Sequence, residues 1–525
     1  MKMNFARLTA QVARAYGDRE ALVNVERARR YTARELHLLS NRIVNMMRDR
    51  LQLRRGDRYM CILENDNLSL LHAWTVLKGE AAAAWTNFRD STDEHFRQID
   101  FLEPKVVFLE NVLLDRFQST LRDRSITIVC MDPLAEPRDG VLCFWDLLEG
   151  VADTDPGVES DIQQDILLYR FTGGTTGLGK CAQYTIDNWL ACGDSFYTTP
   201  DRLMDRETRN AVMAPISHGS GIGLLAIYFR GGCTVTQNLP DLKLWCRVIE
   251  AERISSSSLI PTLLYRLLEL GDASAHDLST LQTVFYGAAP MSPSKLAQLQ
   301  ARFGNIFVQI YGSTECLQAV AMLDTADHVA GDGEAPGHLA SAGRVVPGVE
   351  VAVVDEDGRE LSDGERGEIW IRGRSTISGY YRNPESTATE FADGFWKSGD
   401  IGFRDADGFL YIVDRKKDMI ITGGFNVYAV EVENALNSHP LVVMSAVVGI
   451  PHQEWGEAVH AEVILKDGAR TCAEEMIEHV KAHLGAYKAP KSVTFVADLP
   501  LTPAQKVLRR AVRDKYWTGQ TRRVG

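Results

Sequence analysis

This sequence contains no long apolar run and no recognisable export signal. Its longest apolar stretches, at Leu224–Phe229 and Val442–Ile450, have the length of core strands and fall well short of the roughly 18 residues of a membrane-spanning helix. The first residues, Met1 to Tyr16, alternate arginine with apolar residues and lack the uninterrupted apolar region of a secretory signal. We therefore expect a cytoplasmic protein with no membrane span.

Paired cysteines are also missing. The nine cysteines are odd in number and scattered, and none forms a Cys-x-x-Cys pair. Such a set is typical of reduced, mostly buried thiols in a cytoplasmic protein. We therefore expect neither disulfides nor a structural metal site.

Positive charge is in the minority. The chain carries 57 Lys and Arg against 70 Asp and Glu, and its formal net charge is −13. Nucleic acids bind through clustered basic residues that neutralise phosphates, so no nucleic-acid partner is expected. A nucleotide ligand is still compatible with this charge, because it needs only local positive groups.

The length and the spacing of apolar runs predict an α/β protein of several units. A chain of 525 residues is too long for one hydrophobic core. Short apolar runs alternate with helix-length segments, which is typical of a parallel sheet with crossover helices. The runs are 59–63, 106–109, 126–130, 166–171, 211–215, 283–286 and 306–311.

Two further regions differ in texture. From about residue 345 to residue 413, short strands are joined by tight glycine turns such as Asp357-Gly358, which predicts a β-rich subdomain. Residues 414–525 combine strands with one helix at 473–484, which predicts a small α+β domain. The charged segment Asp414-Arg415-Lys416-Lys417 marks the boundary, so residues 1–413 form the predicted N-terminal domain.

The strongest local motif is Thr172-Gly173-Gly174-Thr175-Thr176-Gly177-Leu178-Gly179-Lys180, directly after the apolar run 166–171. Glycines let backbone N–H groups turn toward an anion, threonine hydroxyls add donors, and lysine adds charge, so a phosphate-binding loop is predicted. Gly174 to Lys180 also fits the start of a P-loop, but Cys181 stands where that motif needs a Ser or Thr for Mg²⁺. A surface turn is the remaining alternative.

Later motifs carry groups that suit a nucleotide. Tyr311-Gly312-Ser313-Thr314-Glu315 follows an apolar run and offers a ring for a base, a hydroxyl for a phosphate and a carboxylate for Mg²⁺. Asp400, after a glycine, suits the two hydroxyls of a ribose. Taken singly, the pentapeptide is also compatible with a strand-ending turn, Arg415 with a solvated boundary charge, and Lys506 with an exposed terminal lysine.

Taken in order, these motifs resemble those of the adenylate-forming superfamily, which includes acyl-CoA synthetases, firefly luciferase and the adenylation domains of peptide synthetases. The resemblance runs from about residue 15 to residue 515. It implies an α/β fold with a large N-terminal domain of αβ-sandwich subdomains plus the β-rich subdomain, and a small, mobile α+β C-terminal domain. It also implies an AMP-forming ligase, in which ATP converts a carboxylic acid into acyl-AMP, pyrophosphate leaves, and a nucleophile then takes the acyl group.

The resemblance implies a role for each motif residue. Lys506 bridges the substrate carboxylate and the α-phosphate, Thr314 contacts the α-phosphate, and Glu315 coordinates Mg²⁺. Lys417 is the hinge of the C-terminal domain, and His218 lies near the acid, with a purely structural hydrogen bond as its alternative. The implied ATP-binding residues are Thr172, Gly173, Thr175, Thr176 and Lys180 for the phosphates, Gly287, Ala288, Ala289 and Tyr311 for adenine, and Asp400 and Arg415 for the ribose.

Coenzyme A is the expected acceptor by the same resemblance. Trp455 is similar to the aromatic residue that receives the nucleotide end of CoA, with a packing anchor as its alternative. Gly423 and Gly424 would line the pantetheine tunnel, where a Cβ would intrude. Ala489 stands where several aryl-CoA ligases carry arginine, which keeps open an amine as acceptor and an amide as product. The acid is expected to be medium-sized or cyclic, and the protein a monomer or a dimer.

Three positions depart from the family pattern, and two other classes of protein stay in competition. Gly179 and Cys181 replace the usual Pro and Gly around the loop lysine, and Gln505 replaces the usual Gly before Lys506. A P-loop NTPase would release ADP rather than AMP. A binding protein of the luciferase fold without catalysis would lack Lys506, Asp400 or Glu315, and all three are present.

Overall fold

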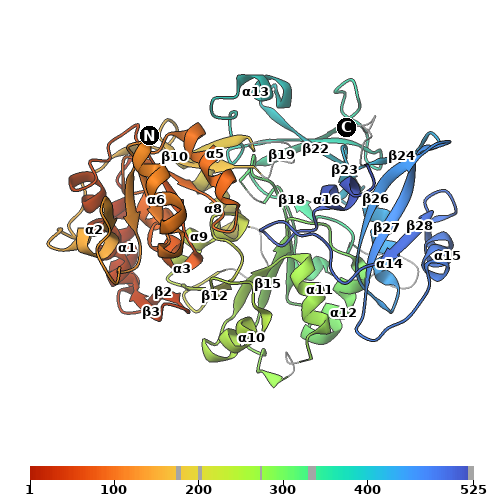
Figure 1. Cartoon of the computed structure of the whole chain (residues 1–525), viewed down its shortest axis with the longest axis horizontal. Coiled ribbons are helices and arrows are strands. Elements are labelled where there is room, and N and C mark those ends of the chain that lie inside the picture. Colours follow the sequence, from red (N-terminus) through yellow and green to blue (C-terminus); the bar gives the residue numbers. More distant parts are fainter. Residues whose placement is uncertain (173–178, 199–203, 272–274, 318, 329–337, 518–525) are drawn as a thin grey trace.

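The computed structural model describes residues 1–172, 179–198, 204–271, 275–317, 319–328 and 338–517. Within these residues the strands form four sheets of five to nine strands and a small sheet of β1 (Lys2–Met3) and β9 (Ser160–Asp161). Figure 1 shows the N-terminal region at the left, the strands around β15 at lower centre, and the C-terminal region in blue at the right. The prediction of an α/β fold is confirmed.

The first large sheet has the strand order β11-β10-β5-β4-β6-β7-β8. Its pairs are parallel except β10 with β11, which is antiparallel. The strands are β4 (Arg58–Ile62), β5 (Ala82–Trp85), β6 (Val106–Leu109), β7 (Thr127–Cys130), β8 (Val141–Cys143), β10 (Ile166–Phe171) and β11 (Cys181–Thr185). The helices of this region are α1 (Phe5–Tyr16), α2 (Ala33–Asp49), α3 (Asn65–Leu70), α4 (Ala73–Val76), α5 (Thr92–Leu102), α6 (Leu114–Asp123) and α7 (Phe144–Leu148).

The second large sheet has the order β18-β17-β16-β15-β14-β12-β13-β2-β3 and is parallel from β16 to β2. Its strands are β2 (Glu20–Asn24), β3 (Arg29–Thr32), β12 (Arg209–Val212), β13 (Cys233–Thr236), β14 (Ser256–Leu259), β15 (Thr283–Gly287), β16 (Phe307–Tyr311), β17 (Ala321–Leu323) and β18 (Arg344–Val345). The crossover helices are α10 (Leu242–Ala251), α11 (Pro261–Glu269) and α12 (Pro293–Phe303). The predicted parallel strands therefore divide between two sheets.

Helices α8 (Ile186–Thr198) and α9 (Leu224–Phe229) contribute to one apolar core with residues of both sheets. Trp189 of α8 and Leu225 of α9 share this core with Leu168 of β10 and Ile310 of β16. The apolar run 224–229, whose length would also suit a core strand, forms the helix α9, because a short buried apolar run fits a helix as well as a strand.

The third sheet is antiparallel and follows the order β19-β20-β22-β21, with β23 also paired to β22. Gly358 and Gly408 lie in tight turns with φ of +80° and +82°, a conformation that favours glycine. The elements are β19 (Val349–Val354), β20 (Gly367–Gly373), α13 (Pro384–Glu390), β21 (Phe391–Ala392), β22 (Phe395–Arg404) and β23 (Leu410–Arg415).

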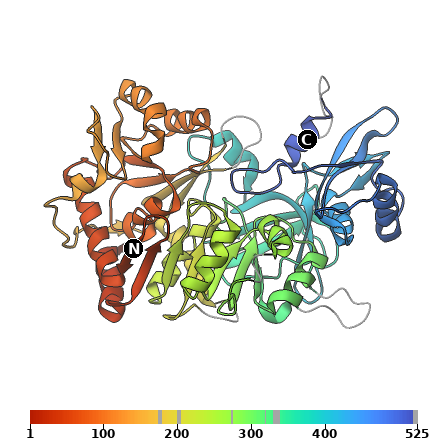
Figure 2. The same ribbon diagram turned by 60° about the horizontal axis from the view of Figure 1, so that its bottom comes forward.

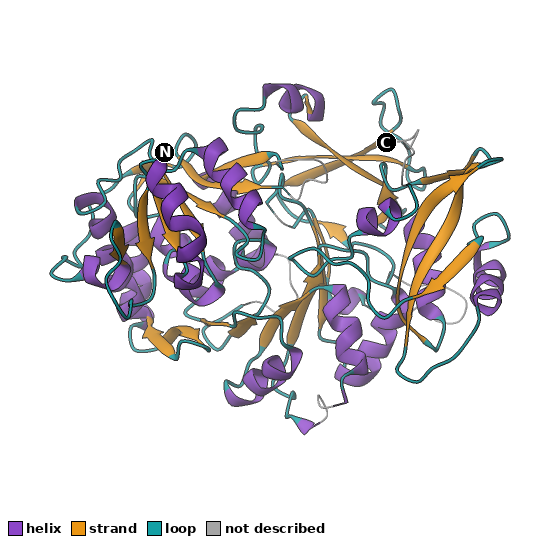
Figure 3. Ribbon diagram, viewed as in Figure 1, coloured by secondary structure: helices purple, strands orange, loops and turns teal. Residues whose placement is uncertain are grey.

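The C-terminal sheet has its own apolar core, to which α14 (Ala429–Ser438) contributes Leu436 and α15 (Ala473–Leu484) contributes Val480. The chain leaves the third sheet at Arg415 and enters this one at Ile420. The strands are β24 (Ile420–Thr422), β25 (Phe425–Val427), β26 (Val442–His452), β27 (Gly456–Leu465) and β28 (Ser492–Phe495), and a last helix is α16 (Arg509–Asp514). Figure 2 shows this sheet beside the preceding strands, and Figure 3 its mixture of helix and strand.

Two helices of the second sheet's region hold the C-terminal unit. Lys295 of α12 is fully buried, and its Nζ donates a hydrogen bond of 2.5 Å to the Val442 carbonyl of β26. Thr262 of α11 donates through Oγ1 to the Gln505 carbonyl at 2.6 Å. The C-terminal segment that contains Lys506 is thereby docked on the N-terminal part of the chain.

The described residues also address the expectations about membrane spans and cysteines. No helix in the described segments is long and apolar enough to be a candidate membrane span. The cysteines are free thiols, most of them buried, with Cys143 half-buried and Cys472 exposed.

Candidate functional site

Two neighbouring strand ends bring the predicted adenine-binding residues together. Gly287 ends β15 and is opposite Ile310 of the parallel strand β16, so 287–289 and Tyr311 meet at the carboxyl edge of the sheet. A Cβ at Gly287 would lie 2.0 Å from the Ile310 carbonyl oxygen, so only glycine fits this close approach. Ala288 then turns the chain with φ of +65°.

Tyr311, Asp400 and Arg415 form a connected group. The Tyr311 hydroxyl donates to Oδ2 of Asp400 at 2.7 Å, and Arg415 Nε lies 3.2 Å from Oδ1 of the same carboxylate. Asp400 and Arg415 are direct partners in the antiparallel register of β22 and β23. The Asp400 charge raises the pKa of Arg415, whereas burial, followed by that charge, raises the pKa of Tyr311. The group therefore presents an aromatic ring that can stack on a base beside a carboxylate that can bind ribose hydroxyls.

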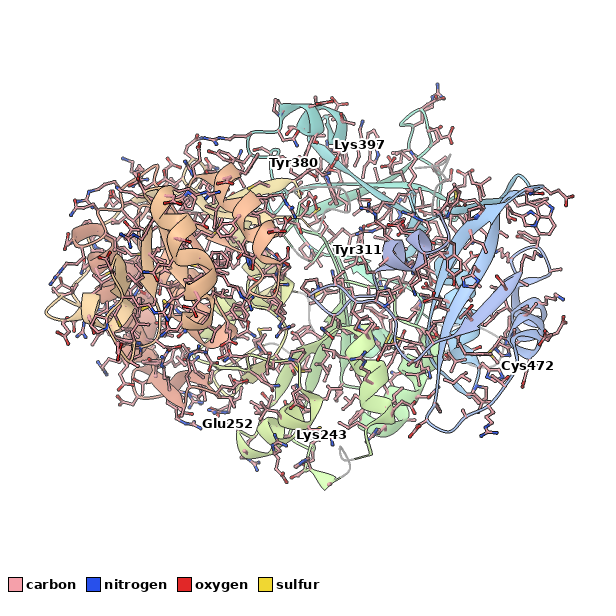
Figure 4. All side chains as sticks on the ribbon, viewed as in Figure 1. Lys243, Glu252, Tyr311, Tyr380, Lys397 and Cys472 are labelled. Atoms are coloured by element: carbon pink, nitrogen blue, oxygen red, sulfur yellow. The ribbon has the colours of Figure 1, made fainter. Side chains whose placement is uncertain are left out.

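A second group surrounds Lys180. Its Nζ is paired with Glu390, at 2.6 Å from Oε2, and lies 3.4 Å from the Tyr380 hydroxyl. The same hydroxyl donates to Glu315 Oε1 at 2.9 Å. Burial, and then the charge of Glu315, raises the pKa of Tyr380. Figure 4 labels Tyr311 near the middle of the molecule and Tyr380 above it.

The ends of the predicted phosphate loop are tied to each other. The Thr172 backbone N–H donates to the Lys180 carbonyl at 2.8 Å, and the Lys180 N–H donates to Thr172 Oγ1 at 3.1 Å. Gly173, Thr175 and Thr176 lie outside the described residues. Cys181 is buried and begins strand β11. A P-loop would begin a helix there, so the P-loop alternative does not fit this backbone.

The turn after β16 fixes Thr314 and Glu315. The Thr314 carbonyl accepts a hydrogen bond of 2.6 Å from the Tyr184 hydroxyl, and the Glu315 N–H donates to Ser313 Oγ at 3.1 Å. Glu315 is 7% exposed. A buried carboxylate close to the lysine that ends a phosphate loop fits Mg²⁺, which takes few protein carboxylates and completes its shell with phosphate oxygens. No described group of three or more His, Cys, Asp or Glu could hold a metal alone.

His218 lies between β12 and the short turn Gly219–Gly221. Its Nδ1 is 2.9 Å from Ser217 Oγ. Burial, followed by the charges of Arg170 and Lys506, lowers the pKa of His218 to about 3. The imidazole is therefore neutral, and it lies within electrostatic reach of both cations.

Lys506 sits in a tight loop of the C-terminal domain. The Thr502 N–H donates to the Lys506 carbonyl at 2.7 Å, and the Lys506 N–H donates to Thr502 Oγ1 at 3.2 Å. Gln505, between them, has φ of +65°, the conformation that accounts for the glycine usual at this position in the family. Burial lowers the pKa of Lys506 to about 8, followed by the charges of Arg415 and Arg170. The charge of Arg415 thus acts on Lys506, and the charge of Lys506 acts on His218.

Lys417 lies in the connection between the third and fourth sheets. Burial and then the charge of Arg415 lower the pKa of Lys417, while the charges of Asp418 and Asp400 oppose that fall. The connection from 416 to 419 is the short link through which a turn of the C-terminal unit would pass.

Gly423, Gly424 and Trp455 gather at one end of the C-terminal sheet. Gly423 and Gly424 have φ of +57° and +84°. The Gly423 N–H donates to the Trp455 carbonyl at 3.0 Å, and a Cβ at Gly423 would lie 3.7 Å from the indole. Trp455 stacks on His452 at 4.1 Å, and Lys491 Nζ lies 5.4 Å from its ring centre. These contacts are made within the C-terminal unit, and none of them involves Lys506.

Ala489 is fully buried in the C-terminal core. A charged arginine in its place would have to extend out of that core to reach a phosphate. That the missing arginine leaves an amine open as acceptor stays a prediction.

Sequence reasoning did not identify Glu390, Tyr380, Arg170 or Thr262. Glu390 and Thr262 act through partners 210 and 243 residues away in sequence, which no local pattern indicates. Arg170 did carry a signal, because a charged residue stood inside the apolar run 166–171 directly before the phosphate loop.

The comparisons with known proteins fit this geometry. The sequence pattern of the AMP-binding enzyme family matches residues 9–381, and that of the AMP-binding enzyme C-terminal domain matches residues 431–506. The medium/long-chain-fatty-acid–CoA ligase FadD8 of Mycobacterium tuberculosis is 38% identical over 383 residues, which are 70% of this chain and 65% of that protein. The feruloyl-CoA synthase of an Amycolatopsis species is 34% identical over 371 residues, which are 70% of this chain and 73% of that one.

A solved structure matches over almost the whole length. The amide bond synthetase McbA from Marinactinospora thermotolerans has a TM-score of 0.85 and 28% identity, with 98% of this chain and 99% of that chain covered. The chain therefore belongs to the AMP-binding enzyme family, and the predicted membership of the adenylate-forming superfamily is confirmed.

Proposed function

We propose that this chain is an AMP-forming ligase, which uses ATP to convert a carboxylic acid into acyl-AMP and then transfers the acyl group to coenzyme A. The observation that carries the proposal is the position of Lys506. This lysine comes from the C-terminal domain, yet the hydrogen bond from Thr262 to the Gln505 carbonyl docks its loop on the second sheet's region. Burial and then the charge of Arg415 lower the pKa of Lys506, and the charge of Lys506 lowers the pKa of His218. A cation at that point lies where the acid and the α-phosphate would meet.

The group of Tyr311, Asp400 and Arg415 and the group around Lys180 together form the ATP site. Tyr311 and residues 287–289 receive adenine, while Asp400 and Arg415 hold the ribose. Thr172, Thr175, Thr176 and Lys180 bind the phosphates, and Thr314 contacts the α-phosphate. Lys180 would exchange its pairing with Glu390 for a phosphate oxygen, which is a charge-for-charge replacement.

Glu315 is the residue that would hold Mg²⁺ together with phosphate oxygens. When bound, the ion supplies positive charge that neutralises the triphosphate. The protein's own part is to keep the Glu315 carboxylate in place, through the Tyr380 hydroxyl and the turn at Ser313.

The first half-reaction is an anion attacking an anion. A carboxylate oxygen forms a bond to the α-phosphorus while the bond from that phosphorus to the bridging oxygen of pyrophosphate breaks. With a pKa of about 8, Lys506 is mostly protonated at pH 7 and donates hydrogen bonds to the oxygens on which charge gathers. His218 is neutral and contributes a dipole rather than a second charge.

The second half-reaction needs the C-terminal domain to turn about Lys417. Lys506 then leaves, and the end of the sheet with Gly423, Gly424 and Trp455 replaces it. The CoA thiolate attacks the acyl carbon, a thioester forms, and AMP leaves. Exclusion of water by the docked domain protects the acyl-AMP from hydrolysis.

The names of the relatives support a CoA acceptor, since FadD8 and the feruloyl-CoA synthase are both CoA-dependent. One observation favours an amine instead, namely the match over nearly the whole chain with the amide bond synthetase McbA. In that case the same acyl-AMP would form, and an amine nitrogen would attack it to give an amide. The acid itself is proposed to be medium-sized or cyclic.

The test is acid-dependent exchange of labelled pyrophosphate into ATP, run with Mg²⁺ over a panel of aliphatic, alicyclic and aromatic acids. At least one acid should support exchange far above the acid-free rate, and turnover with CoA should give AMP and a thioester. ADP as the nucleotide product would contradict adenylation. An amide from supplied amines with no thioester would contradict the CoA assignment alone.

A further inference from the structure

Arg170 is a cation in a buried position, and the described residues give it no counter-charge. It lies on β10, directly before the phosphate loop, and is 5% exposed. Within the described segments no ion pair or hydrogen bond of its guanidinium is found, although an arginine offers five donors. An unpaired buried charge destabilises a fold strongly, so a partner for this group is expected to come from outside the chain.

The strand register gives the direction in which Arg170 points. In the parallel pair of β10 and β5, Tyr169 is opposite Ala84, so the next residues along, Arg170 and Trp85, are neighbours on one face. Trp85 belongs to the apolar core that α8 and α9 share with both large sheets. Arg170 therefore points between the two sheets rather than to solvent.

Other polar groups without partners lie next to Arg170. His72 is fully buried and stacks on Trp85, with ring centres 4.5 Å apart and an angle of 19°. Within the described part of the chain, neither ring nitrogen of His72 and neither Nε1 of Trp74 and Trp85 makes a hydrogen bond. The Ile216 carbonyl is close enough to oppose the fall in the pKa of His72, without hydrogen-bond geometry. Buried donors in native proteins are nearly always satisfied, so this cluster is prepared for an acceptor.

The cluster borders the predicted acid site. Gly221, in the turn after His218, lies so close to His72 that a Cβ there would be 2.9 Å from Nε2. Arg170 also lowers the pKa values of His218 and Lys506. The cluster of Arg170, His72 and Trp85 thus lies between the two large sheets, next to the turn that follows His218.

Resting on the proposed acid-activating function, we propose that Arg170, His72 and the indole N–H of Trp85 bind a second oxygen acceptor, carried by the substrate at the end far from the reacting carboxylate. The substrate class is then a carboxylic acid with a distal carboxylate or carbonyl group. The indole faces beside these donors suit an alicyclic or aromatic body between the two polar ends. A carboxylate would pair with the Arg170 charge, and a carbonyl would accept its N–H groups.

The test compares acids of matched length that differ only at the far end. Aliphatic acids that end in an isopropyl group, a methyl ketone or a second carboxylate are offered in the pyrophosphate exchange assay. The aromatic set is 4-isopropylbenzoate, 4-acetylbenzoate and terephthalate, and the isopropyl acids are the methyl-terminated members. At one chain length, the natural protein should show an exchange rate at least about tenfold higher with the acid that carries a distal oxygen acceptor than with its apolar analogue. The reason is that a buried polar subsite discriminates strongly against an analogue that leaves it unpaired. The ketone and carboxylate arms then identify the group. A general preference for methyl-terminated acids would overturn the proposal.

Arg170→Met keeps the length of the side chain and removes its charge. It should abolish the preference while rates with methyl-terminated acids stay within about threefold, because it removes a buried polar partner and leaves the apolar contacts. An equal loss with every acid would mean that Arg170 acts on the carboxylate or phosphate common to all of them, and would overturn the proposal. His72→Phe keeps the ring stack and removes both nitrogens. It should reduce the same preference, and it carries the test if Arg170→Met does not fold.

Calorimetric binding of the same acids to the full chain, without ATP, separates this proposal from the proposed function. Binding that depends on the distal group and is lost in Arg170→Met would support the subsite even if no acid drove exchange. Exchange with methyl-terminated acids alone, without such binding, would overturn the subsite and leave adenylation intact.

Discussion

Thr262 Oγ1 donates a hydrogen bond of 2.6 Å to the carbonyl of Gln505, the residue before Lys506. Thr262 is the second residue of helix α11 in the second sheet's region, whereas Gln505 belongs to the C-terminal loop. In the proposed mechanism, this bond holds Lys506 in the arrangement for the first half-reaction. It would have to break when the C-terminal domain turns for the second.

Thr262→Val should slow adenylation and spare acyl transfer. The loss of one hydrogen bond, about 0.5–1.5 kcal/mol, corresponds to a fall in the exchange rate of roughly two- to tenfold. Thr280→Val is the matched control, because Thr280 Oγ1 also donates to a backbone carbonyl, that of Ile254 at 2.8 Å, within the second sheet's region alone. Equal losses in the two variants would contradict a docking role for Thr262.

Asp400→Ala should raise the KM for ATP without loss of the fold. Two ribose hydroxyls bonded to a carboxylate contribute about 1.5–3 kcal/mol each, so the rise should be at least about tenfold. Tyr311→Phe keeps the ring and removes only the hydroxyl that donates to Asp400, so it should cost less than Asp400→Ala. Initial rates over a range of ATP concentrations measure both. An unchanged KM in Asp400→Ala would remove this residue from the nucleotide site.

The nucleotide-site residues Tyr311 and Asp400 gave a signal in the sequence, whereas the docking residue Thr262 did not. Tyr311 lies in a short motif at the end of an apolar run, and Asp400 directly follows a glycine, so local pattern was enough to select both as candidates. Their contact is not local, since 89 positions separate them, and it depends on how the second and third sheets meet. Thr262 gave no signal at all, because a threonine at a helix start is ordinary until the C-terminal loop is placed against it.

For the fold as well, the sequence predicted the local elements but not how they are arranged. Alternating apolar runs predicted parallel strands, but they do not encode which strands share a sheet, and the structure divides them between two. The run at 224–229 forms α9, and periodicity alone cannot separate helix from strand in so short an apolar run. Glycine turns predicted the third sheet well, since φ values near +80° leave few other residues possible.

The pH dependence of adenylation should report Lys506. Burial lowers its pKa to about 8 from an ordinary value of 10.5. The ammonium is charged below that pKa and neutral above it, so kcat/KM for the acid should fall as the pH rises through about 8. No inflection from His218 is expected near pH 6.5, because its pKa is about 3. In Lys506→Arg the charge persists above pH 12, so any residual activity should lose this alkaline limb. A limb kept at the same pH would assign it to another group.

Trp455→Ala should weaken coenzyme A and leave pyrophosphate exchange unchanged. An indole face against the CoA adenine contributes about 1–3 kcal/mol, by analogy with base stacking, so the KM for CoA should rise about five- to 150-fold. Trp370→Ala is the matched control, because Lys397 lies 5.1 Å from the Trp370 ring in the third sheet, much as Lys491 lies by Trp455. A fall in exchange in Trp455→Ala would place this residue in the first half-reaction instead.

Whether Lys506 serves adenylation alone is tested most directly in Lys506→Ala, with the two half-reactions measured separately. Pyrophosphate exchange with the preferred acid reports adenylation, and product formation from supplied acyl-AMP and CoA reports transfer. We expect the variant to lose roughly 10²- to 10³-fold in exchange, because one preorganised charged donor is removed, and to keep transfer near the rate of the natural protein. Equal losses in both steps, or exchange that survives without Lys506, would contradict the account in which the C-terminal lysine serves adenylation alone.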